Sequence, residues 1–293
     1  MAFRAEQVLS FDEGFDAAAR LAARLGIPCQ RIEVHIFPDD ERRVTVPACG
    51  RHVAVYRPLD RPNTKLIELL LAASAIRDRG ATDICLIAPY LPYMRQDIAF
   101  HDGEAVSQRV LGQVMAAAFD RFVTVDPHLH RTPHLSQIFG GKPALALSAG
   151  AAIARHVGAD AVILGPDEES ETLVRAVAEP AGLAWRVARK ERHGDRQVEI
   201  RLPGDSGLAG RRAVIVDDII TSGTTIMELV RIARRQGAVS VDVFTTHAMH
   251  PESASHAFAG EGVATVISCD GIPHPTNKIE LAETLATGLE TWR

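Results

Sequence analysis

The chain has 293 residues, of which 46% are hydrophobic, and its 32 basic and 37 acidic side chains leave a formal net charge of −5. This length suits two domains with a core each, and the intermixed charges form no long basic run that would grip a nucleic-acid backbone or an anionic membrane. The longest apolar stretch, residues 66–76, is shorter than the roughly 20 residues of a membrane span. We therefore expect neither a nucleic-acid nor a membrane partner.

The cysteines and the first residues bear on the compartment. The 4 cysteines lie far apart and form no Cys-x-x-Cys pair, which is typical of a reducing compartment and argues against a zinc ribbon. The first 15 residues carry charges and lack the apolar core of a secretory signal. Both observations predict a cytoplasmic protein.

Short apolar runs alternate with stretches of helical spacing along the whole chain, which predicts an α/β fold with mainly parallel sheets. Helices are expected at residues 15–25, 65–79, 106–119, 149–156, 171–179, 225–236 and 279–289. Strands are expected at residues 31–36, 52–56, 83–88, 122–125, 161–164, 183–188, 198–202, 213–216, 239–245 and 263–267. The Gly140-Gly141-Lys142-Pro143 cluster interrupts the pattern, so we predict two domains, 1–143 and 144–293.

Two polar segments of the first half lie next to expected strands. HIFPDDERRV, residues 35–44, is an acidic turn with Phe37, Asp39 and Glu41 at alternating positions. APYLPYMRQD, residues 88–97, follows a strand and places Arg95 and Gln96 at its end. An arginine at such a position either forks onto a phosphate or remains a solvated loop residue, and the residues alone do not separate these alternatives.

Histidines follow the last expected strand of the first half. VDPHLHRTPH contains His128, His130 and His134 close to Asp126. A neutral imidazole there could ligate a divalent ion or orient a phosphate, or these histidines could be ordinary surface residues. A closed zinc site would need a fourth good ligand, which the segment does not offer.

Two segments of the second half carry opposite charge. LGPDEESETL places Asp167 at the end of a strand, before three glutamates whose charge would also suit a helix N-terminus. VARKERHGDRQVEI reads as two antiparallel strands joined by a basic loop with Lys190 and Arg192. That loop is either a solvated hairpin tip or a cover that brings positive charge to a phosphoryl group.

The strongest signal is AVIVDDIITSGTTI, residues 213–226. An apolar strand delivers Asp217 and Asp218, and small hydroxyl residues then lead into a helix. Ligands of open α/β sheets bind beyond the carboxyl ends of the strands, and a helix N-terminus suits a phosphate. Because carboxylates accept hydrogen bonds from sugar hydroxyls, the segment predicts a site for a phosphorylated sugar. The plainer alternative is a capped helix with two solvated aspartates, and the chain contains no Walker loop.

VIVDDIITSGTT resembles the phosphoribosyl-diphosphate motif of type I phosphoribosyltransferases and ribose-phosphate diphosphokinases. PYLPYMRQD resembles a segment of the diphosphokinases alone. Further likenesses to that family follow in TVDPH, GPD, the Lys-x-Arg loop, FPDDE and GIPHPTNKI, the last without a chemical role that the residues suggest. The chain is therefore identified as a member of the ribose-phosphate diphosphokinase family, which implies two phosphoribosyltransferase-like domains, the first for ATP and the second for ribose 5-phosphate.

The resemblance also implies the reaction and the site. The diphosphoryl group of ATP would pass to the C1 hydroxyl of ribose 5-phosphate, with Mg²⁺ as cofactor. The sugar phosphate would be held by Asp217, Asp218, Thr221, Ser222, Gly223, Thr224 and Thr225. ATP would be held by Phe37, Asp39, Glu41, Arg95, Gln96, Asp97 and His128; metal by His128 and Asp167; and the catalytic residues would be Lys190 and Arg192. Since the turn with Phe37 would reach the ATP of a neighbouring subunit, the family implies a homo-oligomer of at least two chains.

Two departures from the family pattern keep alternatives open. Ile98-Ala99 stand where many members have Arg-Lys, and Glu168-Glu169-Ser170 replace a Gly-Gly pair after the aspartate. A catalytically silent regulatory relative would tolerate both changes, although Lys190 and Arg192 speak against it. A phosphoribosyltransferase is the other alternative, and the segments for ATP count against it.

Overall fold

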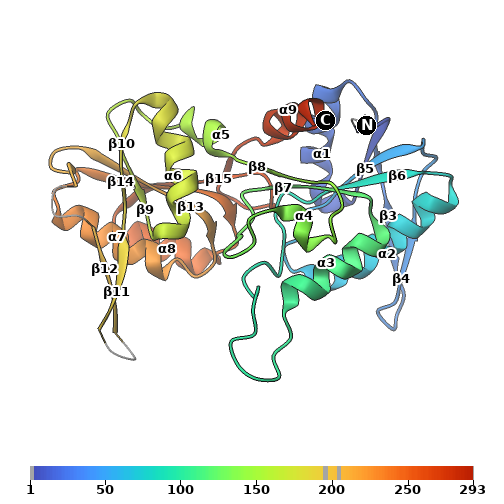
Figure 1. Cartoon of the computed structure of the whole chain (residues 1–293). Helices are drawn as coiled ribbons and strands as arrows, with labels where there is room; N and C mark the ends of the chain where they lie inside the picture. Colours follow the sequence, from blue (N-terminus) through green and yellow to red (C-terminus); the bar gives the residue numbers. More distant parts are fainter. Residues whose placement is uncertain (1–2, 194–196, 203–205, 293) are drawn as a thin grey trace. The chain divides into compact units, whose positions relative to one another are not determined.

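The computed structural model describes residues 3–193, 197–202 and 206–292, with the backbone alone for residues 190–193 and 197–199. The chain forms two compact units. Unit 1 comprises Met1–Leu147, Gly271–Pro273 and Leu281–Arg293, and unit 2 comprises Ser148–Asp270 and His274–Glu280. Figure 1 labels the elements of both units.

Unit 1 is built on a six-stranded parallel sheet. In the order β2-β1-β5-β6-β7-β8, its strands are Cys29–Arg31, Gln7–Ser10, His52–Tyr56, Asp83–Ile87, Arg121–Val125 and Ala144–Leu147. Its helices are α1 (Phe15–Leu25), α2 (Pro62–Asp78), α3 (Ser107–Ala118), α4 (Leu135–Ile138) and α9 (Ala282–Thr291). A separate antiparallel pair, β3 (Glu33–Ile36) and β4 (Arg42–Thr45), carries the acidic turn.

Unit 2 repeats this architecture with a second six-stranded parallel sheet. In the order β10-β9-β13-β14-β15-β16, its strands are Ala184–Val187, Val162–Gly165, Arg212–Ile220, Ser240–Ala248, Val263–Cys269 and Asn277–Ile279. Its helices are α5 (Gly150–Ala154), α6 (Glu171–Ala178), α7 (Thr224–Arg235) and α8 (Glu252–Gly260). A hairpin of β11 (Arg189–His193) and β12 (Gln197–Arg201) projects from this unit (Figure 1).

The central strands have apolar, fully buried middle segments because both faces of each parallel sheet are covered. Val53, Val55 and Ile84 of unit 1 and Val214 and Ile215 of unit 2 are 0% exposed. Each unit has its own buried cluster, as expected for two domains. The predicted α/β fold with mainly parallel sheets is confirmed.

Three differences from the predicted elements have physical causes. The expected strand at 31–36 divides because Ile32 is buried and its N–H bonds Ser10 in the main sheet, while Glu33–Ile36 pair with β4 instead. The last helix begins at Ala282 because Asn277–Ile279 add a strand beside β15. The predicted cut after residue 143 also differs from the compact units, since α9 packs on α1 and β8 and so belongs to unit 1.

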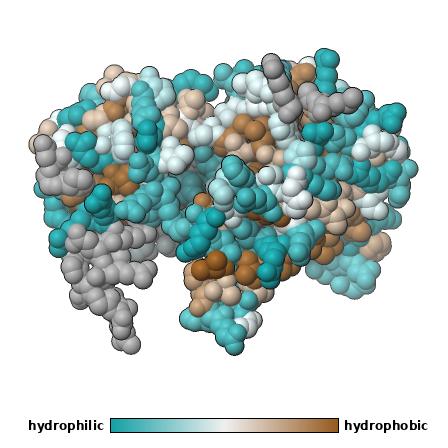
Figure 2. Space-filling view, in the orientation of Figure 1, coloured by the Kyte–Doolittle hydropathy of each residue, from teal (hydrophilic) through white to brown (hydrophobic). Residues whose placement is uncertain are grey.

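The surface of unit 1 exposes apolar side chains on two helices. Ile67 and Leu71 of α2 are 55% and 40% exposed, and Val110 and Val114 of α3 are 49% and 41% exposed. Figure 2 shows hydrophobic side chains gathered on the surface in the region of α3. Among the described residues, no helix is both long and apolar enough to cross a membrane.

Candidate active site

The acid pair lies within the central strand of unit 2. Strand β13 runs from Arg212 to Ile220, four residues beyond the predicted end, and its apolar part, Ala213–Val216, is fully buried. Asp217 and Asp218 are half-buried at the carboxyl end of the sheet, and the Asp218 N–H donates to Oδ1 of Asp217 (3.1 Å). The carboxylates therefore occupy the edge at which parallel sheets bind their ligands.

The electrostatics of this edge join Asp167 to the acid pair. Asp167 follows β9, which pairs directly with β13. The pKa of the Asp217 carboxyl is raised well above its ordinary value, first by burial and then by the negative charges of Asp218 and Asp167. Three predicted site residues thus lie close enough to repel one another, and a cation or hydroxyl donors would relieve that repulsion.

The loop that follows β13 ends on a glycine that no other residue could replace without strain. Gly223 has φ +77° and precedes the first residue of α7, Thr224. A Cβ at Gly223 would lie 2.4 Å from Cζ of Phe258, so the loop backbone lies directly on that ring. Ser222 and Thr224 are exposed, with Oγ and Oγ1 3.2 Å apart. The loop therefore presents hydroxyls and the N-terminus of a 12-residue helix.

The turn after Asp167 is built without the glycines of the family pattern. Glu168–Ser170 form a 3-10 turn, and Ser170 donates to the Asp167 carbonyl through both its N–H (3.1 Å) and its hydroxyl (2.6 Å). A Cβ at Gly165 would meet the Ser170 hydroxyl at 2.2 Å, so the turn folds tightly on β9. Ser170 thus fixes the backbone of Asp167, while Glu168 and Glu169 remain exposed.

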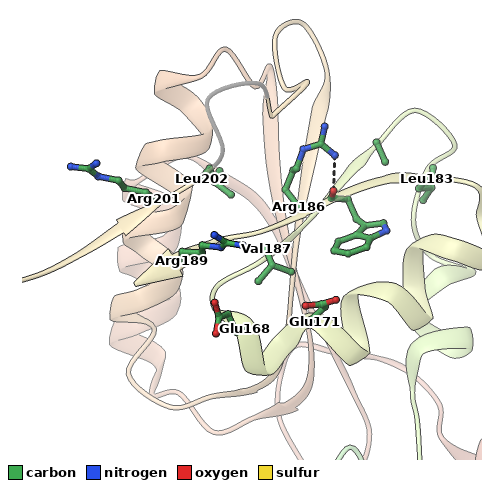
Figure 3. Close-up of a pocket in the computed structure, with 10 residues that line it drawn as sticks. Glu168, Glu171, Leu183, Arg186, Val187, Arg189, Arg201 and Leu202 are labelled. Carbon is green, nitrogen blue, oxygen red and sulfur yellow. Dashed lines mark hydrogen bonds between the residues drawn. The ribbon is translucent and has the colours of Figure 1, made fainter. Parts of the chain in front are cut away.

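A cavity of about 970 Å³ adjoins this turn at the edge of the sheet. Figure 3 shows its polar side chains, which come from the 3-10 turn after Asp167, from the start of α6, from β10 and from the base of the hairpin: Glu168, Glu171, Arg186, Arg189 and Arg201. The Arg186 guanidinium donates to the Trp185 carbonyl (2.8 Å). The cavity therefore combines an aromatic side chain with charges of both signs next to Asp167.

A hairpin lies at the predicted place, but Lys190 and Arg192 belong to its first strand, β11, and not to the joining loop. The strand expected at 183–188 ends at Val187 and pairs parallel with β9. β11 and β12 pair antiparallel, with Lys190 opposite Ile200 and Arg192 opposite Val198. The side chains of Lys190 and Arg192 lie outside the described part of the structure. Their catalytic role stays a prediction.

In unit 1, the segment at 88–97 is tied to its neighbours through two of its predicted ATP residues. The Asp97 side chain, 3% exposed, accepts from the guanidinium (2.8 Å) and the N–H (3.2 Å) of Arg131. Gln96 accepts from the Ser107 hydroxyl at the start of α3 (2.5 Å). Arg95 is exposed at the surface. Asp97 and Gln96 therefore hold the loop shape, and Arg95 has the exposure that a phosphate contact needs.

The histidines follow β7. His128 is half-buried, and its ring meets the ring of His130 edge to face at a centroid distance of 5.3 Å. Asp126 adopts φ +40°, and its N–H donates to the Leu147 carbonyl of β8 (2.8 Å). His134 is exposed and occupies the N-cap position of the short helix α4, without a capping hydrogen bond from its side chain. His128 and His130 thus form a pair from which His134 is separated.

The acidic turn of β3 and β4 is closed by its own backbone. Phe37 and Glu41 are joined by an N–H to carbonyl bond (2.9 Å), and the Asp39 carboxylate accepts from the Glu41 N–H (3.3 Å). Arg42 donates to Asp40 (2.7 Å) and to Glu68 of α2 (3.0 Å), which braces the turn against the helix. Phe37 is 37% exposed at the tip. Its ring meets the His35 ring edge to face at a centroid distance of 4.7 Å, and its stacking on adenine stays a prediction.

Sequence reasoning missed the side chains that support these segments. Arg131, Arg42 and Glu68 hold the loops of unit 1, and His250 and His274 lie behind the loop of unit 2. Apart from Arg42, which lies in the acidic turn itself, each is separated in sequence from the segment that it supports, so no local pattern points to it.

A parallel sheet with an acid pair and a small-residue loop at the end of its central strand defines a phosphoribosyl-binding α/β protein, and a family model described as a phosphoribosyl transferase domain matches residues 136–269. A second family model, the N-terminal domain of ribose phosphate pyrophosphokinase, matches residues 7–118. The chain belongs to the ribose-phosphate pyrophosphokinase family, the diphosphokinases named above.

Individual relatives agree over nearly the whole chain. A "Ribose-phosphate pyrophosphokinase" of Methanopyrus kandleri is 33% identical over 97% of this chain and 98% of its own. A protein of the same name from Saccharolobus solfataricus is 35% identical over 86% of this chain and 88% of its own. The crystal structure of phosphoribosylpyrophosphate synthetase from Mycobacterium smegmatis matches with a TM-score of 0.81 and 25% identity over 97% of this chain and 98% of its own. The predicted family, fold and enzyme class are confirmed.

Proposed function

We propose that the enzyme transfers the β,γ-diphosphoryl group of ATP to ribose 5-phosphate for nucleotide biosynthesis. The C1 hydroxyl oxygen forms a bond to the β-phosphorus, the bond from that phosphorus to the α,β-bridging oxygen breaks, and AMP leaves while the hydroxyl proton is released. The observation that carries this proposal is the grouping of Asp167, Asp217 and Asp218 at the carboxyl edge of unit 2, beside the loop that ends at Gly223.

The residues divide the work by their chemistry. Asp217 and Asp218 accept hydrogen bonds from the ribose hydroxyls, and the loop from Thr221 to Thr225 donates to the 5-phosphate. Lys190 and Arg192 stabilise the charge that spreads over the migrating group, a contribution that phosphoryl transfer needs more than a covalent nucleophile. ATP is bound in unit 1, by Arg95, Gln96, Asp97 and His128.

Mg²⁺ fits the donor set. Asp167 offers the hard carboxylate oxygens that Mg²⁺ prefers. The raised pKa of Asp217 reflects burial first and then the negative charges of Asp218 and Asp167, which a divalent ion would balance. In unit 1, His128 is the other candidate metal and ATP residue, because a neutral imidazole can ligate a divalent ion or orient a phosphate. When bound, Mg²⁺ would neutralise phosphate charge and align the diphosphoryl group.

We further propose a homo-oligomer of at least two chains in the cytoplasm. Exposed apolar side chains on α2 and α3 support association, and an oligomer would let the turn with Phe37, Asp39 and Glu41 reach ATP on a neighbouring chain. The thiols of the four cysteines are free, as expected in a reducing compartment.

The test is AMP formation from ATP that depends on ribose 5-phosphate and Mg²⁺. We expect activity in the native chain, and weakened ribose 5-phosphate binding by calorimetry when Asp217→Asn and Asp218→Asn are combined. Asp160→Asn, an exposed acid of the same unit, is the matched control. Pyrophosphate release with a nucleobase would instead identify a phosphoribosyltransferase, and a folded chain that forms no AMP would identify a silent relative.

A further inference from the structure

Three ring side chains pack together behind the ribose-phosphate loop of unit 2. Phe258 of α8 is 0% exposed, and its ring leaves no room for a Cβ at Gly223. The ring of His250 meets the Phe258 ring edge to face, with centroids 5.5 Å apart. The ring of His274 also packs against the His250 ring, tilted by 52° at a centroid distance of 4.5 Å. A continuous series of ring contacts therefore leads from His274 to the loop.

His250 contributes to this series of ring contacts by packing alone. It is 2% exposed, and neither of its ring nitrogens has a hydrogen-bond partner among the described residues. Burial, together with the neighbouring His274, lowers the pKa of His250 to about 4, so its ring is neutral at physiological pH. A buried neutral ring without polar partners acts through its packing, and an apolar ring of similar shape should replace it.

His274 contributes hydrogen bonds. Its Nε2 lies 3.0 Å from the backbone carbonyl of His250, and its Nδ1 accepts from the N–H of Thr276 (3.3 Å) and lies 2.7 Å from the Thr276 hydroxyl. This pattern requires the tautomer with its proton on Nε2. The Thr276 hydroxyl also lies 2.7 Å from that of Ser268 in β15. His274 is thus anchored to the sheet and holds His250 through its backbone.

We propose that His250 and His274 are positioning residues for the ribose-phosphate loop. His274 fixes the backbone of His250, the His250 ring supports Phe258, and Phe258 holds Gly223 in the left-handed conformation from which α7 starts. This role rests on the proposed function of the loop and deepens it. It also gives a purpose to the GIPHPTNKI segment, in which the sequence alone suggested no chemistry.

His250 acts through packing and His274 through hydrogen bonds. Substitution by Phe should therefore preserve ribose 5-phosphate affinity at position 250 and weaken it at position 274. His250→Phe keeps a ring against Phe258, so the Kd for ribose 5-phosphate should stay within about threefold of the native value. His250→Ala opens a cavity beneath the loop and should raise that Kd about tenfold. His274→Phe keeps a ring but removes the donor to the His250 carbonyl, so it should also raise the Kd about tenfold.

Calorimetry with ribose 5-phosphate and, separately, with ATP gives the readout, on variants whose thermal unfolding shows that they are folded. In His250→Ala and His274→Phe we expect an unchanged Kd for ATP. The KM for ribose 5-phosphate should rise by a larger factor than kcat falls. His256→Ala and His256→Phe, at an exposed histidine of the same helix as Phe258, are the matched controls. Thr276→Val, a milder change at the Nδ1 of His274, replaces His274→Phe if that variant does not fold, and should raise the Kd about threefold.

Three results would overturn the positioning role. The first is a native Kd for ribose 5-phosphate in both folded His250→Ala and His274→Phe (or its Thr276→Val substitute). The second is an equal loss of ribose 5-phosphate affinity in His250→Phe and His250→Ala. A loss of ATP binding as large as that of ribose 5-phosphate would also overturn it, because the support would then be general. Gly223→Ala separates this inference from the proposed function. If that variant binds ribose 5-phosphate normally, the loop is not the sugar-phosphate site and both proposals fail. If it binds weakly while His250→Ala and His274→Phe both bind normally, the positioning role alone fails.

Discussion

Arg57 and Glu68 form an ion pair inside unit 1 whose side chains are only 4% and 8% exposed. Arg57 also donates to Glu13 (2.9 Å) and lies over the ring of Phe11. Glu68 accepts a further bond from Arg42 at the acidic turn. The one acid within the apolar stretch of α2 is therefore the point at which that helix, β5 and the turn are joined.

We expect Glu68→Ala to destabilise the protein by about 3–5 kcal/mol, because it leaves the Arg57 charge buried without this partner. Urea denaturation measures the effect. Glu179→Ala breaks an ion pair with Arg175 in which both side chains are 51% exposed. This change should alter stability by less than about 1 kcal/mol. Equal effects of the two substitutions would show that burial does not set the strength of the Glu68 pair.

The raised pKa of Asp217 predicts a stability that depends on pH. Between the unfolded pKa and the higher folded pKa, the folded chain binds more protons than the unfolded chain, so stability falls as pH rises through that window. Asp217→Asn removes the titrating carboxyl and with it this loss of stability at higher pH. Without metal or substrate, the variant should be more stable than the native chain at neutral pH, and the difference should shrink in acid. Thermal unfolding across pH measures it; a difference that grows in acid would contradict the assigned direction.

Gly223→Ala tests the shape of the loop. A residue with a side chain loses roughly 1–2 kcal/mol in the left-handed conformation, and here its Cβ would also strike Phe258. We expect ribose 5-phosphate binding to weaken by at least about tenfold, since the loop must move. Gly26→Ala is the control, because Gly26 has φ +67° with nothing within 4 Å of its Cβ position. It should lose stability without any change in ribose 5-phosphate affinity by calorimetry.

Lys190→Ala should lower kcat by about 100-fold or more while the Kd for ribose 5-phosphate changes little, as expected for a contact made mainly in the transition state. Steady-state AMP formation and calorimetry together separate the two effects. Lys278→Ala, an exposed lysine of the same unit, should leave both unchanged. Near-native turnover of Lys190→Ala would show that Lys190 is not a catalytic residue.

Local chemistry in the sequence predicted the segment around Asp217 well. An apolar run, two acids and a glycine at a strand-to-helix junction carry their own structural signal, so the loop and α7 follow from nearby residues. Strands β1 and β8 were missed because QVLS has a single β-branched residue and ALAL has none, so neither carries the composition typical of a strand.

Tertiary partners could not be predicted in the same way. Asp97 was placed at a ligand site by resemblance, but its engagement with Arg131 depends on two loops that meet only in the folded unit. His250 looks like an ordinary polar residue after a strand. Only the packing of α8 and of the segment with His274 shows that it is buried.

The position of α9 bears on the order in which the protein is made. Residues 282–291 leave the ribosome after nearly all of unit 2, yet they pack on α1 and β8 of unit 1. The surface of unit 1 that α9 covers therefore stays exposed until most of unit 2 has been synthesised. A nascent chain that stalls before residue 282 would lack α9, so the completion of unit 1 depends on translation past unit 2.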